Sequence, residues 1–131
     1  MYEDIQEVLF TQEQIRARVA QMGAQITADY ADRQPLVVIS VLKGAAIFMA
    51  DLVRAIDLPL EMDFMVVSSY GLGAMSSGTV SIVKDLGASI EGKHVLIAED
   101  ILDSGLTLSF LVEELSRRSP ASLEIATVSY T

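Results

Sequence analysis

The chain has 131 residues, 51% of them hydrophobic, and a formal net charge of −9, so it is long enough to bury a core and we expect a single domain over residues 1–131. Nine Lys and Arg against eighteen Asp and Glu exclude a nucleic-acid surface that works by neutralising phosphates. There is no cysteine, no secretory leader and no apolar run near the about 20 residues that span a bilayer, so we expect a cytoplasmic protein without a membrane partner.

The first predicted elements are a helix and a buried strand. Apolar residues recur at spacings of three and four along residues 11–32, as on one face of a helix: Ile15, Val19, Met22 and Ile26. Thr11 and Gln14 have the spacing of a capping box at its start. The run LVVISVL at 36–42 is continuously apolar and rich in β-branched residues, which is typical of a central parallel strand covered on both faces.

The later segments continue this alternation. We expect a helix over 44–57, strands over 60–69, 79–85 and 93–100, a helix over 106–119 and a strand over 123–130. This pattern predicts an α/β fold with a central, mainly parallel, twisted sheet flanked by helices, and such sheets bind ligands at the carboxyl ends of their strands. The last strand would be an edge, be covered by a partner, or be left by truncation. The Gly- and Ser-rich residues 70–78 fit a flexible lid loop.

The most informative residues follow the predicted strand at 93–100. They are two acids at its end, a third acid three residues on, and small or hydroxyl residues that open the next helix: Glu99, Asp100, Asp103, Ser104, Gly105 and Thr107. Adjacent carboxylates repel unless a cation or a hydroxyl-rich ligand lies near them, while a helix N-terminus presents unpaired amides. Singly, these residues also fit a helix cap or solvated acids. Together they predict a phosphate cradle beside acids suited to ribose hydroxyls or Mg²⁺.

This stretch resembles the diphosphosugar-binding signature of the type I phosphoribosyltransferases, and Asp103 in its middle resembles the hypoxanthine-guanine branch. Other motifs match in order over residues 5–130: Val41-Leu42-Lys43-Gly44, Ser68-Ser69-Tyr70-Gly71, Ser76-Ser77-Gly78 and Lys84-Asp85-Leu86. The resemblance implies the type I phosphoribosyltransferase fold. It also implies purine salvage, in which phosphoribosyl pyrophosphate and hypoxanthine or guanine give a nucleoside monophosphate and pyrophosphate.

The resemblance also assigns roles to the acidic stretch. The residues that would hold the 5′-phosphate are those that open the helix: Ser104, Gly105, Leu106 and Thr107. Ile101 and Leu102, in the same loop, count among the substrate-binding residues. Glu99 and Asp100 would engage the ribose hydroxyls and Mg²⁺, which prefers few direct protein ligands. Asp103 would be the catalytic base that accepts a proton at N7 of the purine.

Two further motifs would handle pyrophosphate. Lys43 and Gly44 would contact it through charge and backbone amides, and the family has a cis peptide bond between the positions of Leu42 and Lys43. Ser69 and Tyr70 would lie on the lid that shields the cationic sugar from water. By this resemblance Lys43 and Tyr70 are catalytic, and Leu42, Gly44 and Ser69 bind substrate. Taken alone, Lys43 also fits an ordinary lysine at a helix start, and Tyr70 a half-buried aromatic.

The sequence departs from the family at its end. Members continue into a hood segment that contacts the purine, and Thr131 stands where that segment supplies a lysine. We therefore expect a truncated chain without the hood. The alternatives are a non-catalytic nucleotide-binding or regulatory module, and a transferase that acts on xanthine. The resemblance also implies a homodimer or homotetramer.

Overall fold

The computed structural model describes residues 11–70, 79–99, 101–102, 105–127 and 129–130. The helices and strands in these ranges have the following bounds: α2 Gln12–Asp29, β1 Leu36–Val41, α3 Ala46–Arg54, β2 Glu61–Tyr70, β3 Thr79–Lys84, β4 His94–Ala98, β5 Ile101–Leu102, α4 Gly105–Ser116, β6 Ser122–Ala126 and β7 Ser129–Tyr130. None of these helices is long and apolar enough to cross a membrane.

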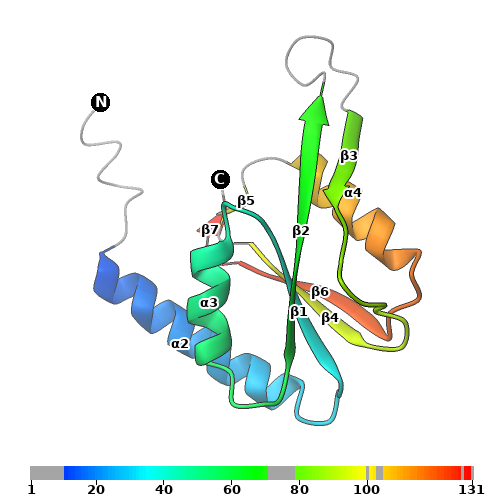
Figure 1. Cartoon of the computed structure of the whole chain (residues 1–131). Coiled ribbons are helices and arrows are strands. Elements are labelled where there is room, and N and C mark those ends of the chain that lie inside the picture. Colours follow the sequence, from blue (N-terminus) through cyan, green and yellow to red (C-terminus); the bar gives the residue numbers. More distant parts are fainter. Residues whose placement is uncertain (1–10, 71–78, 100, 103–104, 128, 131) are drawn as a thin grey trace, which may run out of the picture.

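Five strands form the main sheet in the order β3-β2-β1-β4-β6, and β5 pairs with β7 separately (Figure 1). Strands β2, β1, β4 and β6 run parallel to one another, whereas β3 is antiparallel to β2. Figure 1 shows α2 and α3 on one side of this sheet and α4 on the other. The predicted α/β fold with a mainly parallel sheet flanked by helices is therefore confirmed.

Strand β1 is covered on both faces, as its apolar run predicts. Leu36 and Val38 pack with apolar side chains of α2 and α3, whereas Val37 and Ile39 pack with Leu111 and other side chains on the α4 face. This alternation follows from the two-residue period of a strand. The central strand thus packs against an apolar cluster on each face of the sheet.

Helix α2 begins where the sequence predicts and ends earlier. The Thr11 hydroxyl accepts a hydrogen bond from the Gln14 amide at 3.0 Å, and the Gln14 side chain accepts one from the Thr11 amide at 2.9 Å. This reciprocal pair confirms the capping box. The helix ends at Asp29 because Tyr30 turns into the core, where it is 1% exposed.

Tyr30 ties the end of α2 to the edge strand β6. Its hydroxyl donates to Glu124 Oε1 at 2.8 Å, and Arg33 donates to the other oxygen of the same carboxylate at 3.3 Å. The pKa of the Tyr30 phenol is raised well above its ordinary value of 10.0. Burial is the largest cause, and the hydrogen bond to Glu124 is the second. His94 begins β4 and bonds through Nδ1 to Ser122 Oγ at 2.7 Å, which gives the histidine a structural role.

The strand predicted over 123–130 is observed as two pieces, β6 and β7. The β4–β6 ladder ends with Ala98 opposite Ala126, and a second ladder resumes with Ile101 opposite Ser129. Both pairs are separated by the same 28 residues (126 − 98 and 129 − 101), so the register is kept across the break. The prediction of one continuous strand is wrong, because the strand pairing stops after Ala98 and Ala126 and resumes only at Ile101 and Ser129.

Candidate active site

The carboxyl ends of β1 and β4 bring together two of the predicted motifs. The two strands are adjacent and parallel, with Ile39 opposite Ile97. Continued by two residues, this register brings Val41 level with Glu99. The loop Leu42–Gly44, which follows β1, and the acidic stretch, which follows β4, therefore leave the sheet at the same edge, where open α/β sheets bind their ligands.

The loop Leu42–Gly44 is tied to the sheet at one end and open at the other. The Leu42 amide donates to the Met65 carbonyl of β2 at 2.9 Å, and the Ala46 amide donates to the Lys43 carbonyl at 3.2 Å. The Leu42–Lys43 peptide bond is cis, as the resemblance implies. Lys43 and Gly44 are exposed, and a Cβ added to Gly44 would meet no atom within 4 Å. An anion therefore has room to approach this backbone.

The acidic stretch is braced by the strand that follows it in the chain. The amide of half-buried Glu99 donates to the Ala126 carbonyl at 3.0 Å. Ile101 and Leu102 form β5, paired with β7. Gly105, Leu106 and Thr107 lie in the first turn of α4, where a phosphate-binding helix start was predicted. The other three predicted residues of this stretch lie outside the described residues: Asp100, Asp103 and Ser104.

Strands β2 and β3 form an antiparallel arm that carries the predicted lid. Ser69 and Tyr70 end β2, and their backbones pair with Val80 and Thr79 of β3. Figure 1 shows this pair of strands extending past the end of β1. The predicted lid residues 71–78 lie outside the described part of the chain.

An ion pair that the sequence patterns did not reveal joins the residue after β3 to the turn after α4. The Arg118 guanidinium donates to both carboxylate oxygens of Asp85, at 2.9 and 3.2 Å, and also pairs with Glu114 at 3.0 Å. The hydrogen bonds from Arg118 lower the pKa of the Asp85 carboxyl, and the bond to Asp85 raises the pKa of the Arg118 guanidinium. The C-terminal end of β3 is therefore fixed to the C-terminal end of α4.

Replacing Asp85 with Asn is expected to lower the free energy of unfolding by about 0.2–1 kcal/mol near neutral pH, a small amount because the Asp85 side chain is half exposed. The folded pKa of Asp85 lies below its ordinary value of 3.8. The contribution is therefore full above that value and is lost as the pH falls through the lower folded pKa. Urea unfolding from about pH 7 to about pH 3 should show the wild-type and variant curves converging. In an Arg118→Met background the same substitution should have a smaller effect, because only the Leu86 amide and the charge of Lys84 still favour the Asp85 carboxylate. An undiminished effect in that background would contradict this account.

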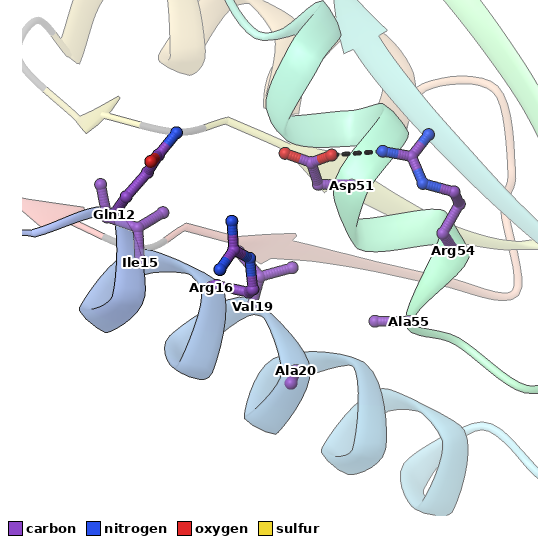
Figure 2. Close-up of a pocket in the computed structure, with 8 residues that line it drawn as sticks. All are labelled: Gln12, Ile15, Arg16, Val19, Ala20, Asp51, Arg54 and Ala55. Carbon is purple, nitrogen blue, oxygen red and sulfur yellow. Dashed lines mark hydrogen bonds and ion pairs between the residues drawn. The ribbon is translucent and has the colours of Figure 1, made fainter.

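Two hollows formed by the described residues lie away from these motifs. Figure 2 shows a hollow of about 370 Å³ between α2 and α3. Its lining residues are Gln12, Ile15, Arg16, Val19, Ala20, Asp51, Arg54 and Ala55. The two arginines there are paired with carboxylates, Arg16 with Glu13 at 3.1 Å and Arg54 with Asp51. A larger hollow of about 640 Å³ lies between α2 and the edge strand β6. No predicted site residue lines either hollow.

One buried polar group near the predicted site was missed by sequence reasoning. Ser40, next to last in β1, is 0% exposed, and its hydroxyl has no hydrogen-bond partner among the described residues. A buried hydroxyl without a partner costs about 1–3 kcal/mol. The run LVVISVL gave no sign of this because one serine among six apolar residues fits an ordinary strand.

Comparisons with known proteins agree with these motifs. Residues 6–130 match the model of the phosphoribosyl transferase domain family. The hypoxanthine-guanine phosphoribosyltransferase of Bacillus subtilis is 54% identical over 128 residues, which are 98% of this chain and 71% of that protein. The bifunctional protein TilS/HprT of Listeria innocua is 52% identical over 98% of this chain, which spans 20% of that protein.

A solved structure of a hypoxanthine phosphoribosyltransferase from Staphylococcus aureus superposes with a TM-score of 0.87 at 50% identity, covering 95% of this chain and 67% of that one. The chain therefore belongs to the phosphoribosyltransferase domain family and, within it, to the hypoxanthine-guanine phosphoribosyltransferases.

Proposed function

We propose that the protein transfers the phosphoribosyl group of phosphoribosyl pyrophosphate to hypoxanthine or guanine, giving IMP or GMP and pyrophosphate. In this step the bond from C1′ of the ribose to the pyrophosphate oxygen breaks and its electrons leave with pyrophosphate. A bond from C1′ to a purine nitrogen forms, and the proton that the purine gives up passes to a carboxylate. The observation that carries the proposal is the parallel pairing of β1 with β4, which puts the loop Leu42–Gly44 and Glu99 at one edge.

The chemistry of this edge suits a leaving diphosphate. Lys43 supplies a positive charge, and the open space beside Gly44 admits an anion to the backbone. The first turn of α4, which begins at Gly105, adds unpaired amides and the positive end of the helix dipole for the 5′-phosphate. We assign the ribose hydroxyls to Glu99 and Asp100. The purine proton is assigned to Asp103, on the same loop.

Magnesium fits the donors of this stretch. Glu99, and Asp100 beside it in the sequence, carry carboxylates, and Mg²⁺ prefers oxygen ligands from one or two carboxylates together with substrate phosphates. We therefore propose a site that the protein shares with the phosphates of the substrate. When bound, the ion would neutralise charge on the diphosphate.

We also propose a homodimer or homotetramer in the cytoplasm. Large apolar side chains are exposed on α3, β2 and β3, namely Ile47 at 78%, Met62 at 46% and Val83 at 66%. Strand β6 is an edge of the main sheet, and a partner would cover such surfaces. The cytoplasmic location rests on the cysteine-free composition.

Purified protein incubated with phosphoribosyl pyrophosphate and Mg²⁺ tests the function. Pyrophosphate release and nucleotide formation are measured with hypoxanthine, guanine, xanthine and adenine in parallel. We expect turnover with hypoxanthine or guanine and none with adenine. Turnover with xanthine alone would move the assignment to that base. Binding of phosphoribosyl pyrophosphate without turnover on any base would instead indicate a nucleotide-binding or regulatory module.

A further inference from the structure

Ser40 stands out because its environment gives its hydroxyl no partner. It is the polar member of the buried set in the described part of the chain, and its Oγ makes no hydrogen bond there. Serine in this position is a local departure from an otherwise apolar strand. Such departures are kept in proteins mainly where a function uses them.

The position of Ser40 relates it to the loop that follows β1. Strand alternation puts its side chain on the same face as Val38, toward α2 and α3. The register with β2 sets it beside Phe64, and the β1–β4 register, continued by one residue, sets it beside Ala98. Both neighbours are apolar. The hydroxyl therefore lies at the end of the core, and only Val41 separates Ser40 from the loop Leu42–Gly44 in the chain.

Binding of an anion would leave a carbonyl of this loop without a hydrogen-bond donor, and the Ser40 hydroxyl can supply one. In the trans peptide groups that follow Lys43 and Gly44, the N–H and the C=O point in opposite directions. When an N–H of the loop turns outward to an anion, a carbonyl turns inward, where it needs a donor. The Lys43 carbonyl already accepts from the Ala46 amide at 3.2 Å, and the helix cap Ala45 offers no side-chain bond. The Ser40 hydroxyl is a buried donor close to this loop in the chain, and it has no other partner among the described residues.

We propose that Ser40 is a positioning residue for the loop Leu42–Gly44, whose hydroxyl donates to a carbonyl of this loop when the loop binds the diphosphate of the substrate. The proposal rests on the function proposed above. It would give the Ser40 hydroxyl the hydrogen-bond partner that it lacks among the described residues.

Titration calorimetry on the full chain tests this with two probes, phosphoribosyl pyrophosphate and ribose 5-phosphate, each with Mg²⁺. The Ser40→Ala variant should bind phosphoribosyl pyrophosphate about three- to tenfold more weakly, the worth of one hydrogen bond. Its affinity for ribose 5-phosphate, which has no diphosphate, should be unchanged. Its melting temperature should not fall, because the substitution removes an unpaired buried hydroxyl.

Ser122→Ala is the matched control. It removes a hydroxyl that bonds to His94 at the opposite end of the sheet, so it should lower the melting temperature and leave both affinities alone. Equal affinity of Ser40→Ala and wild type for phosphoribosyl pyrophosphate would overturn the proposal. So would a parallel loss of stability or of ribose 5-phosphate binding, which would indicate a structural role. Failure of the wild type to bind phosphoribosyl pyrophosphate would instead remove the proposed function, and this inference with it.

Discussion

Replacing Asp103 with Asn is expected to lower the turnover of hypoxanthine by about 10²–10⁴-fold, the usual contribution of a general base. The asparagine side chain keeps the shape of the carboxylate and cannot take the purine proton. Because the proposed role concerns the base and not the sugar, the affinity for phosphoribosyl pyrophosphate should stay within about twofold of the wild type. Steady-state kinetics together with titration calorimetry separate the two effects.

Asp32→Asn is a suitable control because it removes the same charge from an exposed turn after α2. It should change neither turnover nor affinity, which excludes a general effect of net charge. An Asp103→Asn variant with full activity would show that another group accepts the proton. Equal losses of turnover and of phosphoribosyl pyrophosphate binding would assign Asp103 to the sugar-phosphate side.

Replacing Gly23 with Ala is expected to destabilise the fold strongly. A Cβ at this position in α2 would lie 2.3 Å from the Ala55 carbonyl oxygen and 2.4 Å from the Ala55 Cβ. Alanine gains about 1 kcal/mol of helix propensity over glycine, but overlap with backbone forces the helices apart and costs more. We expect a net loss of about 2–3 kcal/mol, or about 10 °C in melting temperature. Thermal and urea unfolding would measure it.

The helices cannot easily slide to relieve this overlap. The Thr27 hydroxyl donates to the Gly23 carbonyl at 2.7 Å and accepts from the Asp57 amide at 2.9 Å, which joins α2 to the turn after α3. Gly87→Ala is the matched control, since its Cβ would come no closer than 3.9 Å to Asp63, and it should stay within about 0.5 kcal/mol of the wild type. A Gly23→Ala variant as stable as this control would mean that the two helices are less closely packed than described.

The elements that sequence reasoning found are those with a local signal. The capping box of Thr11 and Gln14 and the apolar run of β1 are visible in neighbouring residues, and both are confirmed. Parallel pairing at the carboxyl edge followed from the alternation of strands and helices. The roles of Asp103 and the other site residues came from the motif resemblance, and they stay predictions.

The features that were missed depend on residues far apart in the chain. Asp85 and Arg118 are 33 residues apart, and no periodicity shows that they meet. A glycine inside a helix, such as Gly23, lowers helix stability, and its neighbours in sequence do not show why it is there. The close approach of Ala55 explains it, because a Cβ would have no room. Ser40 looks like an ordinary strand residue until the burial of its neighbours is known. The break between β6 and β7 likewise reflects how far one ladder extends, which composition does not determine.

The short ladder of β5 with β7 has a consequence for how this protein tolerates change. Ile101 and Leu102 are held in place through main-chain pairing with Ser129 and Tyr130, and main-chain pairing does not depend on which side chains are present. The backbone position of Ile101 and Leu102 can therefore persist while the side chains of Ser129 and Tyr130 drift in evolution. A mutational library over Ser129 and Tyr130 should retain far more functional members than one over the loop after β1.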